Sequence, residues 1–231
     1  MNSKQFVAQI IADNQALFRA SQINVKAYFD SKPSQQELVD HFIGRMVNER
    51  MNMVEIAKTV SELPADTDPV ELELLSKQAL DEAIHFRLVK EVIEHIQGSP
   101  VDVEAAIGSE KRANTAKGAT LLAKYGAEND PIALACYQLV AEGRAEAVWT
   151  TMSECIEDEF ISGSYAKIAR DEGFHASIGA RKLEQLMKTD ADRAHALDLV
   201  SRMRKDLYEI SCLNTTAAAD GKKLVADAYG W

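Results

Sequence analysis

Apolar residues recur along most of the chain at the three- and four-residue spacing that is typical of amphipathic helices. The clearest stripe, from Phe42 to Leu63, predicts a helix over about residues 35–63. Similar stripes predict helices over about residues 3–21, 70–97, 130–155, 157–187 and 190–213. The first of these helices is expected to carry Ile11 on its apolar stripe. No segment alternates between apolar and polar residues over a useful length, so the chain is expected to be all-α.

Capping and breaking residues set the expected helix boundaries. Ser34 is a suitable N-cap for the helix that follows it, Gly98 ends the next helix, and Asp130, which precedes a proline, starts another. The stretch from 99 to 130 is too long for a tight turn, so we expect it to run along the length of a bundle and to contain one or two short helices. The chain therefore predicts two long helices, a long crossover, two further long helices, and extra helices at both ends.

The composition limits the classes of function. The chain has 231 residues, of which 46% are hydrophobic and 27% charged, and this balance favours one globular domain over residues 1–231. Lys and Arg total 26 against 36 Asp and Glu, so the net charge of −10 argues against nucleic acid as a partner. No apolar run predicts a membrane span or a signal peptide, and three cysteines without CxxC spacing predict neither a disulfide framework nor a zinc ribbon. A cytoplasmic protein is expected.

The sequence Asp-Glu-x-x-His occurs twice, at residues 81–85 and 171–175, each time inside a predicted helix. A Glu and a His three residues apart lie one turn apart on the same face of a helix, so both can reach one metal ion. From composition alone, two such motifs have a chance of about one per cent. Both motifs lie on apolar stripes, where a bare charge is costly to bury, so their Glu and His residues are expected to bind metal.

Two further carboxylates are expected from the other two long helices, because a dinuclear site of this kind takes one Glu from each. In the helix before the crossover, Glu49 lies on the apolar stripe and Glu55 on a polar face, so Glu49 is the predicted ligand. In the helix after the crossover, both Glu142 and Glu146 lie on the stripe. Glu142 is preferred, and Glu146 stays open as an alternative ligand or an outer partner of the site.

The complete set predicts a pair of first-row metal ions. Four carboxylates and two imidazoles suit iron or manganese, and four negative charges match two divalent ions. Asp81 and Asp171 each precede a ligand His by four residues, and they are expected to accept the second imidazole N–H as outer partners of the site. The predicted metal ligands are Glu49, Glu82, His85, Glu142, Glu172 and His175.

These six residues resemble the ligand set of the di-iron carboxylate proteins of the ferritin-like superfamily, over about residues 35–187. The paired Asp-Glu-x-x-His is similar to that of bacterial multicomponent monooxygenases. The resemblance implies a ferritin-like four-helix bundle with a long crossover between its second and third helices and with extra flanking helices. It also implies a non-haem di-iron oxidoreductase, an oxygenase or oxidase. Such an enzyme uses two Fe ions, dioxygen and electrons from a reductase or ferredoxin to oxidise a small apolar substrate.

Two other interpretations stay open at this point. The same dinuclear site would serve a dimanganese catalase-like protein with two Mn ions, or a protein that oxidises and stores iron. The third interpretation is an α-helical interaction protein that binds no metal. The sequence leaves open the substrate, the electron donor and assembly into a homodimer.

Overall fold

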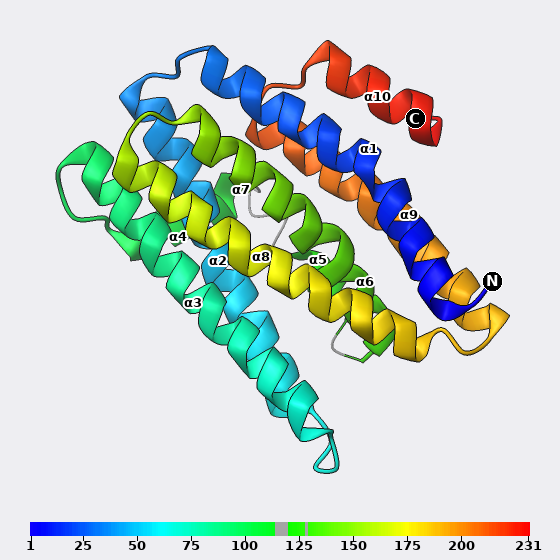
Figure 1. Cartoon of the computed structure of the whole chain (residues 1–231). Helices are drawn as coiled ribbons and strands as arrows, with labels where there is room; N and C mark the ends of the chain where they lie inside the picture. The colour runs from blue at the N-terminus through cyan, green and yellow to red at the C-terminus, as the bar shows by residue number, and fades with distance from the viewer. Residues whose placement is uncertain (114–119, 128) are drawn as a thin grey trace. The chain divides into compact units, whose positions relative to one another are not determined.

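The computed structural model describes residues 1–113, 120–127 and 129–231, and these described residues form helices and no strands. The prediction of an all-α chain is confirmed, whereas the ferritin-like four-helix bundle is not. Figure 1 labels the helices α1 (Ser3–Asp30), α2 (Gln35–Glu62), α3 (Pro69–Gln97), α4 (Val103–Ala113), α5 (Leu121–Lys124), α6 (Pro131–Tyr137), α7 (Gly143–Cys155), α8 (Glu159–Leu186), α9 (Asp190–Asn214) and α10 (Ala219–Tyr229). Within the described residues, no helix combines the length and apolar character that a membrane span needs.

Local capping explains where the long helices begin and end. The Ser34 N–H donates to Glu37 Oε2 (2.7 Å) and the Glu37 N–H donates to Ser34 Oγ (3.3 Å), which forms a capping box at the start of α2. Asp68 and Asp130 each cap a helix whose first residue is proline, and Gly98 ends α3 in the left-handed conformation, with φ +69°. The boundaries predicted at Ser34, Gly98 and Asp130 are therefore confirmed.

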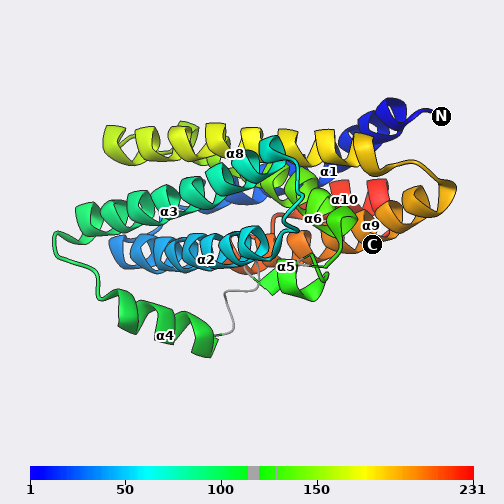
Figure 2. The same cartoon turned by 90° about the horizontal axis from the view of Figure 1, so that it is seen from below.

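The chain divides into two compact units, and the predicted single domain over residues 1–231 stays a prediction. Unit 2 comprises residues 33–123. In it, α2 and α3 are joined by a short loop and lie side by side in antiparallel directions, and α4 contacts α2 (Figures 1 and 2). The buried apolar residues of α2 and α3 recur at helical spacing and include Phe42, Met46, Val89 and Ile93. This pair of helices carries the first Asp-Glu-x-x-His motif.

Unit 1 comprises residues 1–32 and 124–231 and carries the second motif, on α8. The long helix α1 contacts α7, α8, α9 and α10, while α6 contacts α8 and α9. Figure 1 shows α10, in red, on the outer side of α1. Fully buried side chains from four of these helices, Leu17, Met152, Leu183 and Val200, belong to the core of the unit.

A π-helical segment separates α6 from α7. The sequence predicts one unbroken helix over about 130–155, but Gln138–Glu142 form a π-helix, which we call η2. A π-helical turn contains one extra residue, and this shifts every later residue by about 100° around the helix axis. An apolar stripe counted through this segment is therefore assigned to the wrong face. Glu142 is the last residue of η2, so its direction depends on the shift.

The first helix also differs from the prediction. It continues to Asp30 rather than ending near residue 21, because its later residues keep partners elsewhere in unit 1. The Ala218 N–H donates to Asn24 Oδ1 (3.0 Å), and Val25 is buried. Ile11, which was expected on the apolar stripe, is 39% exposed.

Gly179 allows α8 to approach α6 closely. A Cβ atom added at Gly179 would lie 2.6 Å from the Ala135 carbonyl oxygen and 2.7 Å from Gln138 Cβ. Because backbone is the nearest neighbour, the clash has no easy relief. We expect Gly179→Ala to lower the free energy of unfolding by about 1–3 kcal/mol, measured by chemical denaturation.

The matched control is Gly163→Ala on the same helix, where an added Cβ would meet nothing within 4 Å. Alanine has the higher helix propensity, so this change should raise the free energy of unfolding by up to about 1 kcal/mol. Equal effects of the two substitutions would contradict the close approach of α8 and α6.

Candidate metal-binding triads

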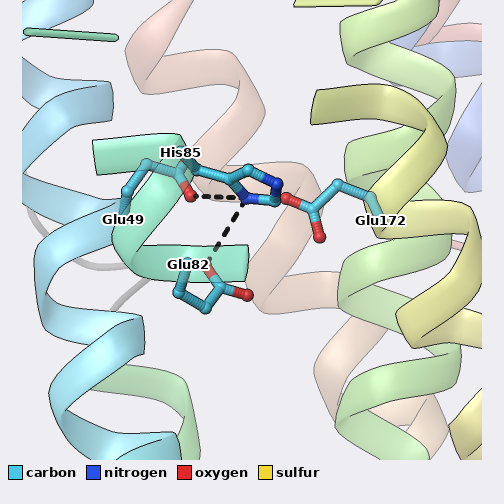
Figure 3. A group of neighbouring side chains, drawn as sticks. All are labelled: Glu49, Glu82, His85 and Glu172. Carbon is cyan, nitrogen blue, oxygen red and sulfur yellow. Dashed lines mark ion pairs between the residues drawn. The ribbon is translucent and has the colours of Figure 1, made fainter. Parts of the chain in front are cut away.

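The first group of predicted ligands lies within unit 2. Glu49 comes from α2, and Glu82 and His85 come from successive turns of α3. His85 Nδ1 lies 3.6 Å from Glu49 Oε2 and 3.9 Å from Glu82 Oε2, and dashed lines mark both ion pairs in Figure 3. Each of the three residues offers one ligand atom within 4.8 Å of the others. We call this group the Glu49 triad.

The spacing in the Glu49 triad fits a cation better than direct hydrogen bonds. Distances of 3.6 and 3.9 Å exceed ordinary hydrogen-bond length. Two ligand atoms that each lie about 2.1 Å from a common ion are about 3.0–3.5 Å apart, which a small movement of these side chains would reach. Glu49 Oε2 is buried and makes no hydrogen bond within the described part of the chain. A buried carboxylate oxygen in this position needs a positive partner.

The second group lies within unit 1 and has the same composition. Glu142 ends η2, and Glu172 and His175 come from successive turns of α8. His175 Nδ1 lies 3.1 Å from Glu172 Oε2, and each of the three residues again offers one ligand atom within 4.8 Å of the others. We call this group the Glu172 triad. Each unit therefore brings two carboxylates and one imidazole together.

Burial distinguishes these residues from ordinary surface acids. All six members of the two triads are at most 4% exposed. Glu55, the alternative on α2, has intermediate exposure, as expected from its polar face. The structure thus places the predicted ligands of each unit together in the interior. That all six form one dinuclear site stays a prediction.

Each predicted outer partner lies beside a lysine on its own helix. Asp81 forms an ion pair with Lys77, and Asp171 Oδ2 lies 2.6 Å from Lys167 Nζ. The predicted hydrogen bonds from the imidazole N–H groups to Asp81 and Asp171 stay predictions. Sequence reasoning missed these lysines, although the signal is present: both motifs belong to a longer repeat, Lys-x-Ala-x-Asp-Glu-x-x-His.

Glu146 does not belong to the Glu172 triad, but it lies close to the same turn of α8. A Cβ atom on Gly173 would lie 2.8 Å from Glu146 Oε1, so the missing side chain leaves room for the carboxylate against α8. The pKa of Glu146 is raised, first because the surrounding protein removes water from the carboxylate and second because Glu172 carries like charge. That Glu146 serves as an alternative ligand or an outer partner of the site stays a prediction.

Comparison with known proteins identifies the fold. No protein-family model matches the chain, and a search of curated proteins finds no match. Among solved structures, the chain is similar to a TenA homolog from Pseudomonas syringae pv. tomato, with a TM-score of 0.68 and 12% sequence identity. The similarity covers 90% of this chain and 92% of the other. This extent includes residues of both units, so the likeness concerns the fold as a whole.

This likeness corrects the interpretation drawn from the motifs. The predicted membership of the ferritin-like superfamily is wrong, because the fold matches a TenA homolog over nearly its full length. The predicted di-iron oxygenase or oxidase activity, and with it the monooxygenase assignment, rested on that membership and is overturned with it. The physical reason is that the Glu-x-x-His spacing only places two side chains one turn apart on a helix. Any long helix can do this, so the motif does not identify the fold.

Proposed function

We propose that this protein binds two divalent first-row metal ions, iron or manganese, one on each triad. The observation that carries the proposal is the repetition: each unit brings two carboxylates and one imidazole together, buried in the chain, with ligand atoms within 4.8 Å. A single buried Glu-His pair has many structural explanations. Two triads of equal composition, on helices that share a nine-residue repeat, point to a shared chemical task.

Charge supports the choice of ion. The two carboxylates of a triad neutralise one divalent cation, so binding removes the cost of holding two negative groups in the interior. Oxygen and imidazole ligands suit manganese and iron, whereas sites that select copper(I) are rich in sulfur. A triad leaves further coordination positions open, and a bound ion there supplies Lewis acidity to a water or substrate oxygen.

The same imidazole nitrogen is used in both triads. His85 and His175 both direct Nδ1 toward a carboxylate of their own helix. For Nδ1 to bind a cation, its lone pair must be free, so the proton of the neutral ring must sit on Nε2. Asp81 and Asp171 are the acceptors that we propose for that proton, as outer partners of the site.

The first test is metal content after loading with Mn²⁺ and removal of excess ion. We expect two equivalents per chain for the unaltered protein. Glu49→Gln keeps the shape of the side chain but removes its charge, so it should weaken one site by more than the roughly 10–100-fold that loss of an outer partner causes. Glu142→Gln should weaken the other site, and Glu55→Gln, on the same helix as Glu49, should weaken neither.

The possible outcomes of this experiment differ in meaning. Loss of one ion per substitution supports separate triads. Loss of both ions after either substitution supports a shared dinuclear site. Stoichiometry below one in the unaltered protein, or equal loss in Glu55→Gln, contradicts metal binding by the triads.

The second test is the stability of the folded state. An ion that binds only the folded protein adds about 2.7 kcal/mol to the free energy of unfolding when its free concentration is one hundred times its Kd. We expect Mn²⁺ to raise the unfolding midpoint of the unaltered protein and to raise that of Glu49→Gln by less. Mg²⁺ is the control, because it prefers oxygen and water to imidazole and should have the smaller effect. Equal effects of the two ions would argue against ligation by His85.

A further inference from the structure

A pocket of about 500 Å³ lies within unit 1, bounded by α1, η2, α7 and α8. Its volume is in the range of small-molecule sites in proteins. The apolar part of its lining is formed by Ile11, Phe18, Leu139, Ala147, Ala176 and Ala180. The pocket owes its shape partly to Gly143, where an added Cβ would lie 3.0 Å from the ring of Phe18. Its walls suit the apolar body of a small ligand.

One charge faces this pocket. Among the described residues that line it, Glu146 is the charged one, and the other polar lining residues are neutral. An anion would meet a carboxylate with no lysine or arginine in the lining to offset it. A cation would gain a charge-assisted hydrogen bond at the same position. The lining therefore selects for positive charge.

A second polar group, Asn14, has its orientation fixed. Arg204 Nε donates to Asn14 Oδ1 over 2.7 Å, and because a guanidinium has no acceptor, the amide oxygen must face it. Asn14 is fully buried, and its Nδ2 makes no hydrogen bond within the described part of the chain. An unused amide donor in a residue that lines the pocket is costly unless a ligand or water accepts from it.

The C-terminal helix holds this part of α1 in place. The Tyr229 hydroxyl donates to the Asp13 carbonyl oxygen (2.6 Å) and accepts from the Leu17 N–H (3.0 Å). These two groups are four residues apart, the spacing that an α-helix joins by a backbone hydrogen bond. Arg204 also lies over the Tyr229 ring, 5.3 Å from its centroid. Tyr229 and Arg204 together fix the turn of α1 that carries Asn14.

We propose that this pocket binds a protonated organic amine with a small apolar body and a neutral hydrogen-bond acceptor. Glu146 pairs with the ammonium group, the apolar walls cover the body, and Asn14 Nδ2 donates to the acceptor. Neither Glu146 nor Asn14 belongs to a triad, although the charge of Glu172 acts on Glu146.

The test uses four probes of nearly equal shape and isothermal titration at low salt. They are 4-methoxybenzylamine, which carries all three features, 4-methylbenzylamine, which lacks the acceptor, 4-methoxybenzyl alcohol, which lacks the charge, and 4-methoxybenzoate, which reverses it. We expect the methoxy amine to bind about tenfold more tightly than the alcohol, as one charge-assisted hydrogen bond allows, and the benzoate to bind least.

Three variants assign the site. Glu146→Gln should weaken the methoxy amine about tenfold and leave the alcohol unchanged, whereas Glu154→Gln, an exposed acid on the same helix, should change neither. Asn14→Asp removes the amide donor, so the advantage of the methoxy amine over the methyl amine should disappear. Ala180→Phe fills the pocket and should weaken every probe. Circular dichroism confirms that each variant is folded.

Several results would overturn the proposal. Equal binding of amine and alcohol would remove the role of charge. Equal weakening by Glu146→Gln and Glu154→Gln would show general surface attraction. Unchanged binding in folded Ala180→Phe would place the amine elsewhere on the protein.

Discussion

The structure depends most on the burial of carboxylates beside imidazoles inside helical units. A carboxylate that leaves water without a positive partner is strongly disfavoured. In unit 2 this constraint falls on Glu49 and Glu82, which flank His85 Nδ1. Long helices meet the constraint well, because they fix the direction of each side chain through many backbone hydrogen bonds. Ser34 caps the start of α2 and Gly98 caps the end of α3, so both helices have defined ends.

Much of the secondary structure follows from the sequence, because helical periodicity and caps act locally. Ser34, Gly98 and Asp130 mark the boundaries that the structure has. The Glu-x-x-His spacing also places Glu172 beside His175 wherever α8 happens to lie. The fold itself is not fixed by such local rules. How long helices connect and cross depends on contacts between distant residues, and this is why a correct motif was compatible with the wrong family.

The remaining errors have tertiary causes. The extra residue in η2 changes the phase of the helix, so one apolar stripe cannot describe the whole helix predicted over 130–155. The Tyr229 hydroxyl forms hydrogen bonds with backbone groups of α1 more than 200 positions away in the sequence. No local sequence pattern predicts this contact. Ile11 borders a pocket rather than the core. Periodicity assumes a regular helix, and the helix predicted over 130–155 departs from regularity at η2, beside the pocket.

Three glycines show how close packing and open space arise from the same helices. At Gly179, α8 approaches the backbone of α6 so closely that no side chain fits. At Gly143, the missing side chain makes room for the Phe18 ring, and at Gly173 it makes room for the Glu146 carboxylate. The tight contact at Gly179 fixes α8 against α6, and the two others admit side chains that shape and charge a cavity. Two helices packed by large residues along their whole length would have neither the close contact nor the cavity. The distribution of small residues along α7 and α8 thus sets the chemistry of the pocket as directly as its polar residues do.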